Sequence, residues 1–337
     1  MKRPQRCFGP KLFILAVLLL PLLSREGLTQ TCQSSAEMEA PVKSGLESAA
    51  ERYFAMTAKG DVSGLQQSSI PSVASNFGGI EAAVKDVQPR IAGAQPTLRS
   101  SWLLQASSDL KDRAEFLCGV FGAHGQTANS AAFQLSNLSA GNYAVAIFDV
   151  AGPKAPETVS FVLQQAGNDW KLAGFYAKPA AINGHDGAWF ADRARQFKAK
   201  GQNRNAWLYF LQARDLVSPL TFMSTAMTDK LYDEMQPVQP SDLPVNGSTI
   251  DLPVGGKVEK LTSMFPAGFG DDLDLVVKYQ ATDVSNTGAS FQANMAVIKA
   301  VVAKYPEFRD AFAGVIARAV DPSGRDYGTL LPMKEIK

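Results

Sequence analysis

The sequence of 337 residues is poor in the residue types that build most catalytic and metal sites. It contains only three cysteines and two histidines. Neither His124 nor His185 has a second ligand at a metal-binding spacing, and the sequence has no CxxC, HExxH, GxSxG, GxGxxG or P-loop motif. We therefore expect no metal site and no bound cofactor, and the sequence favours a protein that is not an enzyme.

Long apolar runs are also scarce, and only one stretch stands out. Residues 12–23, LFILAVLLLPLL, follow four Lys or Arg residues within the first 11 positions. This order is typical of a secretory signal, and the run is shorter than the roughly 20 residues that span a bilayer. We predict a signal peptide over residues 1–30, a periplasmic or extracellular protein, and no membrane span in the mature chain. The residues before Cys32 fit a lipobox poorly, which disfavours a lipid anchor there.

A large charge of either sign is missing as well. The formal net charge is +1, and residues 1–30 hold five Lys or Arg and one Glu, so the remainder carries −3. No basic stripe with interleaved aromatic residues occurs, although a surface that follows a phosphate backbone needs one. We expect no nucleic-acid partner.

The cysteines leave two interpretations open. Cys7 lies in the predicted signal, so Cys32 and Cys118 are the cysteines of the exported chain, where an oxidising compartment would let them pair. A disulfide between them would close a loop of 86 residues and contribute about 4–5 kcal/mol in the chain-entropy model. Alternatively, Cys118 is a small buried apolar side chain and Cys32 stays unpaired.

Periodicity predicts an α+β fold for the first half of the chain. Apolar residues recur at helical spacing from Pro41 to a stop at Gly60, and again over residues 77–92. Six short strand patterns follow between residues 98 and 177, the last two joined by the turn sequence AGND. Helices followed by such a meander predict a domain in which one curved antiparallel sheet covers the helices.

Two segments carry a family resemblance. AERYFAMTAKGD (residues 50–61) and NDWKLAGFYAKP (residues 168–179), with this order of elements, resemble the nuclear transport factor 2-like (cystatin-like cone) superfamily. The resemblance covers residues 41–178 and implies a cone, in a superfamily that includes enzymes, binding cones and dimerisation domains. Polar side chains that point into such a cone would be the candidates for proton transfer. They are Tyr143, Asp149, Tyr176, Glu115 and His124.

Residues 188–219, AWFADRARQFKAKGQNRNAWLYFLQARDLVSP, resemble a tetratricopeptide repeat. In that pattern aromatic residues fill the groove between two antiparallel helices, alanines allow close approach, and glycine makes the turn. The positions that carry it are Phe190, Ala194, Phe197, Gly201, Ala206, Phe210 and Ala213. Only one copy is present, whereas arrays need about three. We therefore expect a helical segment over 187–235, with a third helix over 219–235, that connects two domains.

The remaining chain divides into a linker and a small unit. Residues 236–247 contain three prolines that favour extended structure. Residues 248–334 predict a C-terminal α+β domain of strands, one helix over 289–305, and a hairpin closed at Asp321–Gly324. The polar segment Asn183–Gly187 could hold an acid/base pair of His185 and Asp186, but its glycines favour a turn that leads into the next helix.

These observations predict an exported, non-enzymatic binding or scaffold protein whose partner is a protein or a small molecule. A homodimer through the open face of the first domain's sheet is a further expectation. The alternative is a small-molecule-binding or proton-transfer enzyme that uses the interior of the cone. The alternatives differ in whether that interior is hollow or filled by Phe and Leu side chains.

Overall fold

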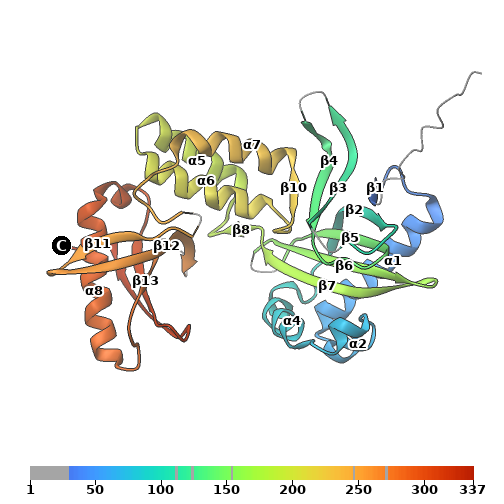
Figure 1. The fold of residues 1–337 in the computed structure, drawn as a ribbon, viewed down its shortest axis with the longest axis horizontal. Helices are drawn as coiled ribbons and strands as arrows, with labels where there is room; N and C mark the ends of the chain where they lie inside the picture. Colours follow the sequence, from blue (N-terminus) through green and yellow to red (C-terminus); the bar gives the residue numbers. More distant parts are fainter. Residues whose placement is uncertain (1–29, 111–112, 123–124, 153–154, 246, 270–271) are drawn as a thin grey trace, which may run out of the picture.

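The computed structural model describes residues 30–110, 113–122, 125–152, 155–245, 247–269 and 272–337. Two lobes lie at opposite ends of the molecule, with a group of helices between them (Figure 1). All but the last residue of the predicted signal peptide lies outside the described residues, and so does His124. No helix in the described part is long and apolar enough to cross a membrane.

The N-terminal lobe begins with helices whose ends follow local sequence rules. Pro41 sits in the first turn of the first helix, where its missing N–H costs no hydrogen bond, and Gly60 ends that helix with a φ of 70°. The short second and third helices lie in a stretch for which the sequence predicts no helix. The four are α1 (Ala40–Lys59), α2 (Val62–Gln67), α3 (Pro71–Ala74) and α4 (Gly78–Ile91).

The main sheet of this lobe is antiparallel, in the order β1-β2-β5-β6-β7. Its strands are β1 (Gln30–Ser34), β2 (Pro96–Ala106), β5 (Gly141–Val150), β6 (Glu157–Ala166) and β7 (Asp169–Pro179). Strand β1 was not predicted from the sequence, and it begins at Gln30, the last residue of the predicted signal. The helices α1 and α4 pack against one face of this sheet.

A second sheet corrects the expectation of one curved sheet. Strands β3 (Ala114–Gly122) and β4 (Gly125–Leu135) leave the main sheet and pair with β10 (Met223–Thr225). The reason lies in β5, where Val145 and Ile147 on one face are as buried as Ala146 and Phe148 on the other. The outer face of the main sheet, turned away from the helices, therefore needs its own cover. The second sheet supplies it and occupies the face through which we expected a homodimer to form.

Aromatic rings fill the space between the helices and the main sheet. Phe54 of α1 lies 5.6 Å from Phe148, ring centroid to centroid, and Phe148 lies 6.0 Å from Phe161. Phe161 in turn lies 5.6 Å from Phe175. All four side chains are buried. The inner side of the predicted cone is thus a packed core.

A short two-stranded ribbon and three helices connect the lobes. They are β8 (Ala181–Ile182), β9 (His185–Asp186), α5 (Gly187–Ala199), α6 (Asn203–Val217) and α7 (Ala226–Met235). The third helix begins later than predicted, because residues 223–225 form β10. Thr225 then caps α7, since its Oγ1 accepts from the backbone N–H of Thr228 while the Thr228 hydroxyl oxygen accepts from the N–H of Thr225.

The two helices α5 and α6 form an antiparallel pair with a tight turn. Gly201 makes that turn with a φ of 74°, a conformation that favours glycine. The six apolar positions singled out in the sequence are each at most 1% exposed. They are Phe190, Ala194, Phe197, Ala206, Phe210 and Ala213.

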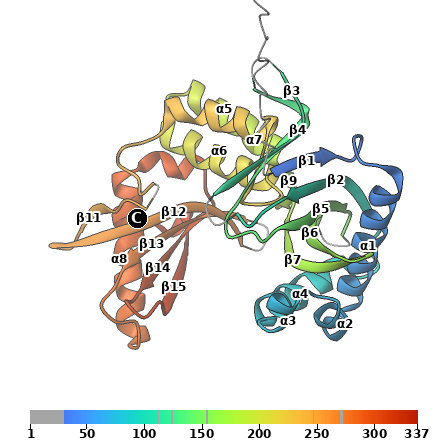
Figure 2. The ribbon, with the colours of Figure 1, turned by 45° about the vertical axis from the view of Figure 1, so that its right-hand side comes forward.

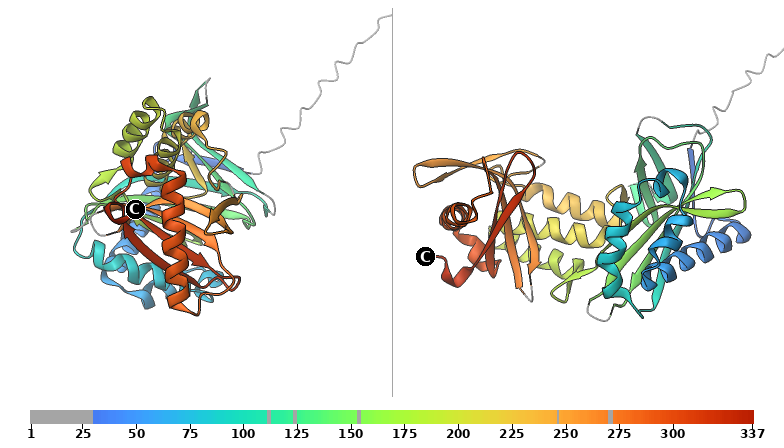
Figure 3. Two further views of the ribbon diagram at one scale, coloured as in Figure 1. Left: turned by 90° about the vertical axis from the view of Figure 1, so that its left-hand side faces the viewer. Right: turned by 90° about the horizontal axis from the view of Figure 1, so that it is seen from below.

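The C-terminal lobe is a five-stranded sheet covered on one side by a helix. The strands are β11 (Ile250–Val254), β12 (Lys257–Phe269), β13 (Asp272–Gln280), β14 (Gly314–Val320) and β15 (Asp326–Pro332), in that order. Helix α8 (Thr287–Lys304) joins the parallel strands β13 and β14. It lies on the sheet face turned away from the N-terminal lobe (Figure 3, left). Short 3-10 turns are η1 (Gln236–Val238), η2 (Pro306–Asp310) and η3 (Met333–Glu335).

The connecting helices lie beside the C-terminal lobe (Figure 2). Their buried apolar side chains form one core with those of that lobe. The Tyr209 hydroxyl of α6 donates to the backbone oxygen of Ala311 at 2.5 Å, and its ring lies 5.9 Å from that of Phe312. The segment predicted as a linker is packed as well over residues 236–245, because Val238 and Leu243 are buried in this core. Helices and C-terminal sheet therefore bury their apolar faces together.

Candidate functional site

The predicted cone-interior residues lie outside the space between sheet and helices. Side chains alternate along a strand, and the neighbours Phe148 and Phe175 face the helices. Asp149 and Tyr176 therefore point to the outer face, and Tyr143 belongs to the core on that face. The structure does not bring the three together at one site.

Each of these candidates has a structural partner. The Tyr143 hydroxyl donates to the Ser139 oxygen at 3.0 Å, and burial raises the pKa of this phenol. Both carboxylate oxygens of Asp149 accept from Nε of Arg99 at 3.0 Å. The ring of Tyr176 packs against that of Phe222 with centroids 5.5 Å apart.

The other polar candidates also have structural roles. The Glu115 carboxylate is exposed and accepts from Nε2 of Gln134 at 3.4 Å. His185 stacks on Trp189 with ring centroids 3.8 Å apart, and Oδ1 of Asp186 caps α5 by accepting from the Trp189 N–H at 2.9 Å. The Asn183–Gly187 segment thus leads into a helix.

A disulfide fixes the position of the second sheet. Cys32 of β1 and Cys118 of β3 are bonded, which ties the hairpin β3–β4 to one edge of the main sheet. On its other side β4 pairs with β10, so that Met223 lies opposite Phe133. The hairpin is held from both sides across the outer face of the main sheet.

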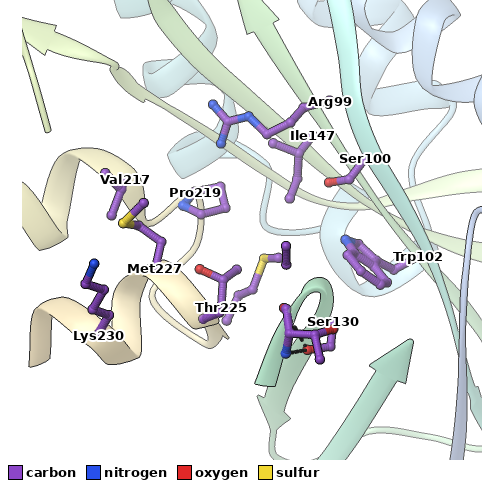
Figure 4. Close-up of a pocket in the computed structure, with 14 residues that line it drawn as sticks. Arg99, Ser100, Trp102, Ser130, Ile147, Val217, Pro219, Thr225, Met227 and Lys230 are labelled. Atoms are coloured by element: carbon purple, nitrogen blue, oxygen red, sulfur yellow. Dashed lines mark hydrogen bonds between the residues drawn. The ribbon is translucent and has the colours of Figure 1, made fainter. Parts of the chain in front are cut away.

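A pocket of about 500 Å³ opens between the main sheet, the hairpin and α7 (Figure 4). We refer to it as the outer-face pocket. The residues that line it come from β2, β4, β5, the end of α6, β10 and α7. They are Arg99, Ser100, Trp102, Thr127, Ala128, Ser130, Ile147, Val217, Pro219, Met223, Thr225, Ala226, Met227 and Lys230.

Trp102 carries an unused hydrogen-bond donor at this pocket. Its side chain is only 7% exposed, and its ring meets that of Phe133 edge-on at 6.0 Å. The indole Nε1 is buried and has no hydrogen-bond partner among the described residues. In Figure 4 the nitrogen-bearing edge of the ring faces the pocket. A buried donor without a partner costs roughly 1–3 kcal/mol, so an acceptor placed here would recover that energy.

The walls around Trp102 are mostly apolar. Ile147 lies on the main sheet, and Val217 and Pro219 come from the end of α6 and the loop after it. Met223 and Met227 complete the side towards α7, and Met227 is 56% exposed. Methionine side chains are flexible and polarizable, which suits them to ligands of varied shape.

Two cationic side chains stand at the pocket. Arg99 is held by Asp149 and donates to the Thr158 hydroxyl at 3.3 Å, so its charge is neutralised. Lys230 of α7 is exposed and makes no salt bridge within the described residues. The lining contains no Asp, Glu, His or Cys among the described side chains. The arrangement therefore offers donors and a positive charge, without an acid/base pair.

Metal binding finds no support in the described part of the chain. No group of three His, Cys, Asp or Glu side chains lies close enough together there to hold a metal ion.

Comparison with known proteins gave no match, since no family model, curated protein or solved structure is similar to this chain.

Proposed function

We propose that this is an exported, non-enzymatic binding protein and that its ligand occupies the outer-face pocket. The ligand is a small molecule with an apolar body and an acidic or hydrogen-bond-accepting end. The observation that carries this proposal is the buried, unpartnered Nε1 of Trp102 at the pocket. Its N–H lacks an acceptor that a bound ligand would provide.

Size and charge support the same ligand class. A pocket of about 500 Å³ falls in the range that holds small molecules, and such pockets are mainly apolar with a few polar groups. Lys230 adds a positive charge that no described carboxylate neutralises by a salt bridge. This charge favours an anionic ligand over a cationic one.

Export is supported by the order of basic, apolar and polar residues at the start of the chain. The disulfide between Cys32 and Cys118 fits an oxidising compartment. Helices on one face of an antiparallel sheet support the resemblance of residues 41–178 to the nuclear transport factor 2-like superfamily. The helix pair α5–α6 likewise supports the resemblance to a tetratricopeptide repeat, used here as a connector between the lobes.

The alternative function, an enzyme or carrier that uses the interior of the cone, is disfavoured by the packing. The rings of Phe54, Phe148, Phe161 and Phe175 occupy the inner side of the main sheet. A ligand there would have to displace this core, whereas the outer-face pocket is open.

The test uses 1-anilinonaphthalene-8-sulfonate, a fluorescent probe with apolar rings and an anionic group. We expect saturable binding to the full chain. Ser100→Phe, which fills the pocket, abolishes this binding, and Thr97→Phe, an exposed position on the same strand, leaves it intact. Trp102→Phe keeps a ring but removes the N–H, and weakens binding about tenfold to a hundredfold. Equal binding by the Ser100 variant and the parent protein would refute the proposal.

A further inference from the structure

A second pocket, of about 730 Å³, lies between the two lobes. We refer to it as the interlobe pocket. The N-terminal lobe contributes Glu157 at the start of β6, and β8 contributes Ile182. From the other side come Leu211 and Gln212 of α6 and Phe265 of β12. Its lining is distinct from that of the outer-face pocket.

Glu157 is a buried carboxylate, and one of its two oxygens accepts no hydrogen bond from a described residue. Its side chain is 1% exposed, and Oε1 accepts from Nε of Arg90 at 2.7 Å. Oε2 is buried and has no hydrogen-bond partner in the described part of the chain. Burial raises the pKa of Glu157 although Arg90 beside it acts in the opposite direction. Burial of such an oxygen costs free energy unless a hydrogen-bond donor reaches it.

Gln212 presents a second polar side chain from the opposite side of the same pocket. Its side chain is 7% exposed and has no hydrogen bond to any described residue. Its amide oxygen is an acceptor and its nitrogen a donor. The pocket therefore holds polar side chains on opposite walls, and neither is fully satisfied by hydrogen bonds to described residues.

The three charged side chains that line this pocket, Arg90, Glu157 and Asp215, are each in a salt bridge. Arg90 serves two carboxylates, because its Nη1 also donates to Asp86 at 3.0 Å. The neighbouring pair of Lys178 and Asp215, with Nζ and Oδ1 2.9 Å apart, is neutral by itself. A ligand with one positive charge would supply a donor to Oε2 of Glu157, since Arg90 donates to Oε1 only, and the apolar lining offers room for a hydrocarbon stem.

We infer that the interlobe pocket binds a small molecule that carries a primary ammonium group on an apolar stem. The ammonium donates to Oε2 of Glu157 and to the amide oxygen of Gln212, and the stem packs against Ile182, Leu211 and Phe265. Primary ammonium suits this site because it offers three donors and a compact charge. The inference does not depend on the outer-face pocket, since no residue lines both.

The test is calorimetric titration of the full chain with n-hexylammonium chloride, compared with hexanol and hexanoate. We expect saturable binding of the ammonium and none of the other two. Glu157→Gln and Gln212→Met each weaken binding about tenfold to a hundredfold, the range for a hydrogen bond to a charged group. Glu81→Gln, which changes an exposed carboxylate on α4 paired with Lys85, leaves binding unchanged.

Gln212→Met keeps the test decisive if Glu157→Gln unfolds. Gln212 has no hydrogen bond in the described structure to lose, so its variant should keep the parent melting temperature. Trp102→Phe, altered in the outer-face pocket, should bind the ammonium like the parent, which separates this inference from the proposed function. No saturable binding, equal binding of hexanol, or parent-like affinity in folded Gln212→Met would each overturn the inference. A water molecule as the only partner of Oε2 would give the first of these results.

Discussion

Removal of the Tyr209 hydroxyl tests whether the connecting helices and the C-terminal sheet form one stable unit. Tyr209→Phe keeps the ring, which lies 5.0 Å from that of Phe197 and 5.9 Å from that of Phe312. It removes the bond to the backbone oxygen of Ala311, which is 9% exposed. Burial raises the pKa of Tyr209 to about 12, so the hydroxyl is a proton donor at neutral pH.

The expected loss of unfolding free energy is about 1–2 kcal/mol, because a carbonyl is left buried without its donor. Hydrogen exchange followed by mass spectrometry should show about fivefold to thirtyfold faster exchange in α6 and in β14 together. Tyr232→Phe is the matched control, since Tyr232 is 49% exposed on α7. Faster exchange confined to the helices, with β14 unchanged, would refute the idea of a shared core.

Three further predictions concern stability. Replacement of Cys32 and Cys118 by serine should cost about 4–5 kcal/mol in urea denaturation, from a closed loop of 86 residues, and an unchanged midpoint would contradict this. Arg204 holds the pKa of Asp242 below its ordinary value of 3.8, so this pair stabilises the fold above that pH and the contribution disappears as the pH falls below it. In Arg204→Ala the free energy of unfolding should therefore fall less steeply as the pH is lowered through this range. An unaltered slope would argue against the pair. Ala206→Leu overfills a completely buried position and should cost about 1–3 kcal/mol by thermal unfolding, whereas parent-like stability would show spare room between the helices.

Elements with local signals could be predicted from the sequence. Helix α1 is bounded by Pro41 and Gly60, and the C-terminal hairpin turns at Asp321, whose Oδ1 accepts from the Ser323 N–H at 2.9 Å. These signals act within a few residues, so they are readable without knowledge of the fold. The α+β class follows from the same periodicities.

Elements with nonlocal partners could not be predicted. Strand β10 has three residues and exists because β4 lies beside it, 90 positions earlier at the pair Met223 and Phe133. Whether β3 and β4 belong to the main sheet depends on which strand pairs with β2. The alternation of apolar and polar residues along a strand cannot show this. The sequence therefore predicts one sheet where two form.

The candidate site was missed for a related reason. Trp102 lies in the apolar run WLL, which predicts a core residue. It is indeed part of a hydrophobic core. Only the tertiary fold shows that its Nε1 finds no acceptor and that Lys230, 128 positions later, lines the same pocket. Candidates chosen by polarity, such as Tyr143, proved to have partners of their own.

The most direct measurement is the indole N–H resonance of Trp102 during titration with 1-anilinonaphthalene-8-sulfonate. The four tryptophans give four such signals in a nitrogen-labelled sample, and Trp102→Phe identifies the relevant one by its loss. We predict that this signal moves downfield and saturates with the binding curve, because the N–H gains an acceptor, while the signals of Trp170, Trp189 and Trp207 stay in place. A Trp102 signal that does not move at saturation would contradict the assignment of the outer-face pocket as the ligand site.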